Sequence, residues 1–254
     1  MSLPIIPLPI ILFLFGLCVG SFLNVVIDWS VGKRKSLFTP PSHCDYCRHK
    51  LGFWDLIPVF SFIFLRRRCR YCGKEISWHY PLVELATGSL FVLSSYTLHP
   101  IPYTLFLFSV FLVIFVTDLK YGLIPDRVIL PATALVFPYS LITHHSSLIT
   151  ALIISAAFTI LYWLTQGKAL GLGDVKLSFF LGLTQGLPYV ILAIWIGFVL
   201  GGLVATALLI LKKKKLKDEI PLGPFLVTGS ILTIFFESSI LGLVDRLIGL
   251  NPKF

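Results

Sequence analysis

The sequence predicts an all-α polytopic membrane protein, with about eight transmembrane helices and a small cytosolic zinc-knuckle domain of four cysteines between the first two. Three observations lead to this prediction. Of the 254 residues, 56% are hydrophobic and only 13% are charged, which is about half the charged fraction of a soluble domain. The apolar residues gather in runs that are long enough to cross a bilayer, and the mean hydropathy is +0.90. Finally, four cysteines lie as two pairs in one polar segment.

Eight apolar runs are candidate membrane spans. The first, residues 8–27, has no Lys or Arg before it and no small-residue cleavage site after it, so we expect a retained helix and not a cleaved signal peptide. Around Gly186 and Pro188, one long kinked segment is the alternative to two separate spans. The remaining runs are residues 81–98, 103–117, 128–143, 148–165, 175–187, 189–211 and 222–241.

The distribution of basic residues predicts the orientation. With the amino terminus outside, the segments 28–80, 118–127, 166–176 and 212–220 face the cytosol and hold 19 of the 21 Lys and Arg residues. This distribution obeys the positive-inside rule. The net charge of +9 is therefore interpreted as an orientation signal and a contact to anionic inner-leaflet lipid, and nucleic-acid binding is not expected.

Three regions follow from this topology. Residues 1–28 are expected to form the first transmembrane helix, residues 29–80 the cytosolic Cys-rich domain, and residues 81–254 a domain of seven helices.

The polar segment contains two C-x-x-C pairs, Cys44 with Cys47 and Cys69 with Cys72, separated by 21 residues. Four thiolates at this spacing can surround one tetrahedral ion, usually zinc. A reducing cytosol disfavours structural disulfides. Four reduced thiols or a redox pair remain as alternatives, although some 50 polar residues would struggle to fold without a metal. Cys18, in the first span, is expected to pack at a close helix contact.

Two aspartates at the ends of spans are the candidate catalytic residues. Asp118 ends the third apolar run, and Asp174 precedes the sixth. Both lie on the cytosolic side of the predicted topology. Carboxyl groups held close together share a proton, so the pair can activate a water and protonate a leaving amine, as peptide hydrolysis requires. Gly171 and Gly173 are expected to allow unusual dihedral angles and a close backbone approach by an extended peptide. The alternative for Asp174, and for Asp126, is a helix cap.

Two glutamates and a pair of histidines are further ionisable groups near the spans. Glu84, at the start of the second span, is expected to cap that helix or to pair with the basic segment. Glu237 is expected to be buried near the end of the last span, and its role is open. His144 and His145 are expected in a surface loop. The sequence contains no H-E-x-x-H zinc-protease motif, no inside-facing G-x-S-x-G and no P-loop.

Taken in order, these motifs resemble those of the type IV prepilin leader peptidases, within the GxGD class of intramembrane aspartic proteases. The resemblance covers nearly the whole chain. It is carried by the two cysteine pairs and by residues 16–26 (GLCVGSFLNVV), 70–73 (RYCG), 80–88 (YPLVELATG), 118–126 (DLKYGLIPD), 171–176 (GLGDVK) and 221–225 (PLGPF).

The resemblance implies a bifunctional enzyme. Asp118 and Asp174 would form the catalytic pair, supported by Asp126, Gly171, Gly173 and Lys176. The substrates would be prepilins or pseudopilins, whose short basic leader is cut after a glycine at the cytosolic face of the bacterial inner membrane. The new amino terminus would then be methylated with S-adenosylmethionine, an activity associated in that family with the cysteine-bearing segment.

Two other classes of protein remain possible from the residues alone. A small transporter would also carry polar residues at helix breaks. A zinc-containing membrane assembly factor would keep the cysteines and need neither aspartate.

Overall fold

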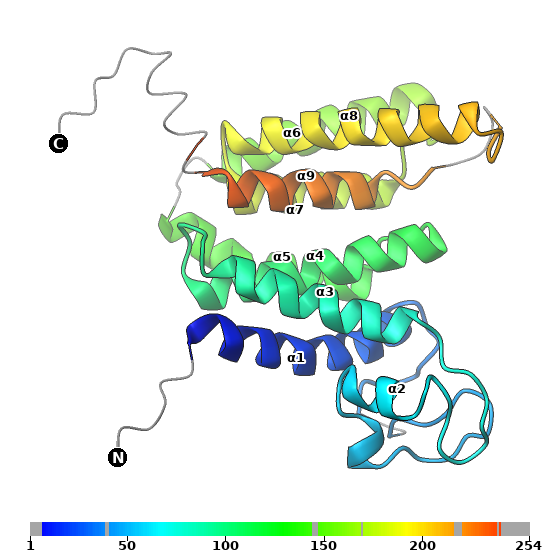
Figure 1. Cartoon of the computed structure of the whole chain (residues 1–254). Coiled ribbons are helices and arrows are strands. Elements are labelled where there is room, and N and C mark those ends of the chain that lie inside the picture. Colours follow the sequence, from blue (N-terminus) through cyan, green and yellow to red (C-terminus); the bar gives the residue numbers. More distant parts are fainter. Residues whose placement is uncertain are drawn as a thin grey trace, which may run out of the picture. The chain divides into compact units, whose positions relative to one another are not determined.

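A computed structural model describes residues 7–38, 41–143, 147–168, 170–215, 220–237 and 239, and within these ranges the fold is all-helical. Apart from two isolated β-bridges, the described residues contain no strand. The all-α prediction is therefore confirmed (Figure 1). The long helices are α1 (Leu8–Ser30), α3 (His79–Ser94), α4 (Ile101–Tyr121), α5 (Asp126–Thr143), α6 (Ser147–Thr165), α7 (Leu172–Gln185), α8 (Tyr189–Ile210) and α9 (Gly223–Phe235).

Each predicted apolar run coincides with one of these helices, and among the described residues four helices meet the requirements for crossing a membrane. By length and composition, α1, α4, α6 and α8 are long and apolar enough. The helices α3, α7 and α9 have 16, 14 and 13 described residues, fewer than the roughly 20 that a simple span needs. The chain is thus an integral membrane protein with at least these four candidate spans, and the remainder of the eightfold topology stays a prediction.

The uncertain break between the sixth and seventh runs is a true helix boundary. Helix α7 ends at Gln185, and α8 begins at Tyr189. Gly186 follows α7 with a φ of 65°, a left-handed conformation that glycine adopts without steric cost. A single kinked segment is thereby ruled out.

The chain divides into two compact units, Met1–Val113 and Ile114–Phe254. In the first unit, α1 packs along α3 through small residues (Figure 1). A Cβ atom added to Gly16 would lie 2.7 Å from Cα of Gly88, and one added to Gly20 would lie 2.7 Å from Cα of Glu84. These glycines therefore set the close helix contact. Cys18 does not take part, because two residues turn an α-helix by about 200°, and its side chain is exposed.

In the second unit, α7 is the central helix and packs against α5, α6, α8 and α9. Leu177, Phe180 and Leu181 on α7 are fully buried. The neighbouring helices, and not lipid, surround most of this helix. Such an environment explains why a short helix that also carries Ser178 and Thr184 is stable there.

Between α1 and α3 lies the Cys-rich segment, which has little regular structure. It contains a 3-10 turn, η1 (Phe53–Asp55), and one short helix, α2 (Phe60–Phe64), which packs against η1. The rest of the described segment consists of turns and the two β-bridges.

Candidate active site and candidate metal centre

Asp118 lies in the last turn of α4 and is almost completely buried, with 6% of the residue exposed. Its Oδ2 atom accepts a 2.9 Å hydrogen bond from the backbone N–H of Gly223, the first residue of α9. A Cβ atom on residue 223 would lie 2.6 Å from that same oxygen. Only glycine leaves room for the carboxyl group in this position. Gly223 lies in the stretch 221–225, for which the sequence alone predicts no role.

Asp174 lies in the first turn of α7, where its Oδ2 atom accepts a 3.0 Å hydrogen bond from the N–H of Gly171. The helix-cap role considered from the sequence is therefore observed. The Asp174 and Asp118 carboxyl groups also lie close enough for their charges to interact. Each group thus accepts a backbone N–H at a helix amino terminus, where negative charge is stabilised.

The segment after α4 meets the start of α7 at two further points. Lys176 Nζ lies 2.6 Å from Asp126 Oδ1. In addition, a Cβ atom on Gly173 would lie 3.0 Å from Cβ of Ile124. Asp126 begins α5 and is exposed, so its carboxylate stabilises that helix and the pairing of α5 with α7.

The two glycines before Asp174 differ in what they require. Gly171 has an ordinary extended conformation, φ −85° and ψ 158°, and a Cβ atom there would make only van der Waals contacts. Gly173 lies within helix α7. Neither has a positive φ, so the expected unusual dihedral angles are not present. At Gly173 the nearest neighbour is Ile124, and the close approach of a peptide substrate stays a prediction.

The four cysteines of the polar segment come together. The sulfur atoms of Cys44, Cys47, Cys69 and Cys72 all lie within 4.8 Å of one another, and the Sγ atoms of Cys44 and Cys72 are 3.8 Å apart. Four thiolates around a tetrahedral zinc ion, with bonds of about 2.3 Å, would place their sulfurs about 3.8 Å apart. The cluster therefore has the donor set and the spacing to bind one metal ion.

The two C-x-x-C pairs have the same local backbone structure. In each, the N–H of the first cysteine donates to the carbonyl five residues later, at 3.0 Å for Cys44 and 2.8 Å for Cys69. The residue after the second cysteine has a left-handed conformation in both, at Arg48 (φ 59°) and at Gly73 (φ 69°). This repeated turn aims two sulfurs from each pair toward the same point. At Arg48 this left-handed conformation is strained, because the residue carries a side chain, whereas glycine adopts it freely.

Asp55, which no sequence motif indicates, links the two halves of the metal segment. Its carboxylate accepts hydrogen bonds from Gly52 N (3.0 Å), Arg70 Nε (2.7 Å) and the Tyr71 hydroxyl (3.1 Å). Burial alone would raise its pKa, but these donors together hold the pKa of Asp55 below its usual value. Arg70 and Tyr71 stand between the cysteines of the second pair. Their bonds to Asp55 were invisible in sequence because 15 and 16 residues separate the partners.

The side chain of Glu84 contacts the backbone of the polar segment. Its Oε2 atom accepts a 2.7 Å hydrogen bond from the N–H of Val59, and 7% of Glu84 is exposed. Val59 has a φ of 62°, which is unusual for a β-branched residue. Glu84 therefore pairs with this segment as expected, but its partner is a backbone N–H group and not a basic side chain.

Glu237 follows the end of α9, and its role stays open. His144 and His145 lie outside the described residues.

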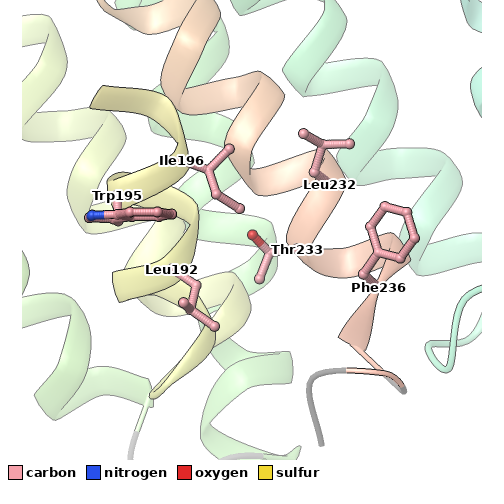
Figure 2. A pocket seen from close by; sticks show the side chains of 6 residues that line it. All are labelled: Leu192, Trp195, Ile196, Leu232, Thr233 and Phe236. Atoms are coloured by element: carbon pink, nitrogen blue, oxygen red, sulfur yellow. The ribbon is translucent and has the colours of Figure 1, made fainter. Parts of the chain in front are cut away.

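An apolar pocket lies between α8 and α9 (Figure 2). Leu192, Trp195 and Ile196 from α8 face Leu232, Thr233 and Phe236 around a volume of about 350 Å³. Thr233 is ten residues beyond Gly223, which corresponds to about 15 Å along a helix. The pocket carries no ionisable side chain and is separate from the candidate active site.

Comparisons with known proteins agree with the motifs. The family described as "Bacterial Peptidase A24 N-terminal domain" matches residues 14–98, and the "Type IV leader peptidase family" matches residues 105–206. The chain is 30% identical over 239 residues to a prepilin leader peptidase/N-methyltransferase of Bacillus subtilis, covering 91% of this chain and 95% of that protein. Proteins of the same name from Burkholderia pseudomallei and Klebsiella pneumoniae are 33% and 39% identical.

The Burkholderia match covers 87% of this chain and 83% of that protein. The Klebsiella match covers 69% and 84%, respectively. No solved structure shows significant similarity to the chain. The two family matches lie end to end, and relatives of the same name align over most of both chains. The chain therefore belongs to the type IV leader peptidase family.

Proposed function

We propose that this chain is a bifunctional prepilin leader peptidase and N-methyltransferase, in which Asp118 and Asp174 cleave the leader peptide. The observation that carries the peptidase assignment is the placement of these two carboxyl groups. Each accepts a backbone N–H on its Oδ2 atom, from Gly223 and Gly171 respectively, and their charges interact. Family membership supports the same activity, and it disfavours a transporter or an assembly factor.

The proposed chemistry follows from the shared environment of the pair. Two neighbouring carboxyl groups do not both ionise readily, so together they hold one proton. The ionised member takes a proton from a water held at the two carboxyl groups, and this water attacks the scissile carbonyl. The protonated member donates to the departing amine, so that the dyad again holds one proton after cleavage. The Gly223 and Gly171 N–H groups keep both carboxyl groups in fixed positions throughout.

Asp126 and Lys176 take a supporting role in this scheme. Their ion pair joins the start of α5 to the start of α7. Gly173 supports the same junction through its contact with Ile124. These residues position the Asp174 turn but do not contact the reacting atoms.

The substrate would be a prepilin, as the names of the relatives indicate, or a pseudopilin, as the resemblance of the motifs implies. We place the chain in the bacterial inner membrane with eight spans. These are the four candidate spans α1, α4, α6 and α8, together with α3, α5, α7 and α9. This topology puts Asp118 and Asp174 at the cytosolic face, where a short basic leader would be cut. It is supported by the location of the basic residues on that side.

The metal is proposed to be zinc, bound by Cys44, Cys47, Cys69 and Cys72. All four ligands come from the protein, as in structural zinc sites, so its contribution is to fold the segment between α1 and α3. S-Adenosylmethionine would supply the methyl group for the new amino terminus. The described residues contain no strand–glycine loop–helix of the soluble nucleotide-binding kind, and we assign none of this chain's residues to the methyl donor.

Incubation of the purified protein with a purified prepilin and the methyl donor tests the proposal. Mass spectrometry is expected to show loss of the leader after a glycine and one added methyl group on the new amino terminus. An intact substrate, with a folded and metal-loaded enzyme, would contradict the peptidase assignment. Cleavage without methylation would contradict only the second activity.

A further inference from the structure

The Cys-rich segment carries a cluster of large apolar side chains that no part of the described structure covers. We call this cluster the aromatic patch; it consists of Phe53 and Trp54 from η1 and Phe60, Ile63 and Phe64 from α2. Trp54 is 71% exposed and Phe64 is 81% exposed. Because α2 packs against η1, these side chains belong to one local surface. Contiguous exposed apolar side chains of this size mark an interaction surface.

The two sides of α2 differ in exposure, and the exposed apolar side chains lie on one side of the helix. Phe62 points inward, where its ring lies 4.9 Å from the ring of Trp78, and only 9% of Phe62 is exposed. Phe60, Ile63 and Phe64 have the i, i+3, i+4 spacing that places side chains on one helix face. The short helix therefore has one apolar face packed into the segment and a second apolar face turned outward.

The segment is held near the membrane surface at both of its ends. It leaves α1, a candidate membrane span, at Ser30 and enters α3 at His79. The N–H of Val59, directly before α2, is also bonded to Glu84 of α3. The aromatic patch is therefore anchored beside a bilayer by three connections, and a lipid surface is within its reach.

Positive charge borders the patch. Arg66 and Arg68 lie two and four residues after the end of α2, and both are exposed. In contrast, the nearby acidic side chains Asp55 and Glu75 are already paired, with Arg70 and Arg67 respectively. Aromatic side chains beside free arginine charge are the composition of segments that lie in the interface of anionic membranes.

We propose that the aromatic patch inserts into the interface of the anionic membrane in which α1 is embedded, with Arg66 and Arg68 contacting lipid phosphate. This binding fixes the metal-bearing segment against the membrane surface. A prepilin is the less suitable occupant, because the basic leader that the proposed function implies would be repelled by the arginines. The inference itself depends on the membrane anchoring of α1 and not on the peptidase assignment.

Quenching of Trp54 fluorescence tests this proposal in the full-length protein. The protein is reconstituted into vesicles of phosphatidylcholine and phosphatidylglycerol, with or without brominated acyl chains, so that both leaflets have the same composition. The chain has five tryptophans, so the emission of Trp54 is obtained as the difference between the wild type and Trp54→Phe. Trp195, which is exposed on the apolar span α8, gives the matched reference through Trp195→Phe. Metal content confirms that the Cys-rich segment of Trp54→Phe is folded.

We expect bromolipid to quench Trp54, and aqueous iodide to leave it largely unquenched. The double variant Arg66→Gln, Arg68→Gln should shift the equilibrium between inserted and free patch about fivefold per arginine removed, and only in anionic vesicles. Iodide quenching without bromolipid quenching would overturn the proposal. Protection of Trp54 that appears only after prepilin is added would also overturn it and identify the patch as a substrate surface. Neither outcome would change the assignment of Asp118 and Asp174.

Discussion

The backbone N–H of Gly223 donates a 2.9 Å hydrogen bond to Oδ2 of Asp118, although 105 residues separate the two along the chain. This bond joins the end of α4 to the beginning of α9. It places the positive end of a helix dipole on a buried carboxyl group. The position of Asp118 therefore depends on a glycine that carries no reactive side chain.

Substitution of Gly223 by alanine should impair peptide cleavage. The new Cβ atom would lie 2.6 Å from Asp118 Oδ2, so the carboxyl group or the start of α9 must move. Displacement of a catalytic group by about 1 Å costs roughly 100-fold in rate. Gly202→Ala is the matched control, since a Cβ atom there has no neighbour within 4 Å. Initial rates of prepilin cleavage measure both variants. Equal rates for Gly223→Ala and Gly202→Ala would contradict the positioning role.

The two glycines before Asp174 should respond differently to alanine. Gly173→Ala creates a contact of 3.0 Å with Ile124, while the closest atom to the new Cβ in Gly171→Ala lies at 3.5 Å. We therefore expect Gly173→Ala to lose most of its cleavage rate and Gly171→Ala to retain most of it. Cleavage assays on both variants at matched membrane levels make the comparison. A larger loss for Gly171→Ala would point to a contact between Gly171 and the bound substrate instead.

The ion pair of Asp126 and Lys176 should contribute modestly. Both side chains are partly exposed, and exposed pairs are worth about 0–1 kcal/mol. Asp126→Asn should therefore slow cleavage only slightly and lower thermal stability by a similarly small amount. The exchange variant Asp126→Lys, Lys176→Asp should recover part of the loss seen in either single variant. Complete inactivity of Asp126→Asn in a folded protein would instead make Asp126 a catalytic residue.

Removal of the metal should unfold the segment between α1 and α3. One zinc ion per chain is expected by elemental analysis, and Cys44→Ser or Cys69→Ser should lower that value well below one. Protease sensitivity of residues 31–78 should rise in parallel, because metal binding provides folding energy. Metal-free wild-type protein with the same protease resistance would show that the thiols need no ion.

The turn after each cysteine pair offers a subtler test of the same centre. Arg48 has a left-handed conformation that costs a residue with a side chain about 1–2 kcal/mol, whereas Gly73 adopts it freely. Arg48→Gly should therefore bind metal more tightly, and Gly73→Ala less tightly, in competition with a chelator. Opposite changes would show that the side chain of Arg48 makes a compensating contact.

Glu84 should hold the polar segment onto α3. Glu84→Leu leaves the N–H of Val59 without its acceptor, which costs about 1–3 kcal/mol if the group stays buried. Glu84→Gln retains an acceptor oxygen and is the matched control. Hydrogen exchange of residues 57–64 should accelerate in the leucine variant and change little in the glutamine variant. Unchanged exchange in both would mean that the bond to Val59 does not restrain the segment.

The helices and the metal cluster could be predicted from local features of the sequence. Apolar runs predict helices because each run must satisfy its own backbone, and the C-x-x-C spacing predicts a shared ion directly. Several long-range contacts could not be predicted. Nothing local indicates that Gly223 would meet Asp118, that Asp55 would bond to Arg70, or that Cys18 would face away from α3. The burial of the short helix α7 among four other helices could not be predicted either, because its own hydropathy does not encode it.

The most direct test of the central claim is prepilin processing by the wild type, Asp118→Asn and Asp174→Asn in membranes. Cleavage of the prepilin and methylation of a pilin that already lacks its leader are followed separately. We predict that both variants insert normally, lose cleavage by several orders of magnitude and still methylate the pre-cleaved pilin. Cleavage by either variant at the wild-type rate would contradict the assignment of Asp118 and Asp174 as the catalytic pair.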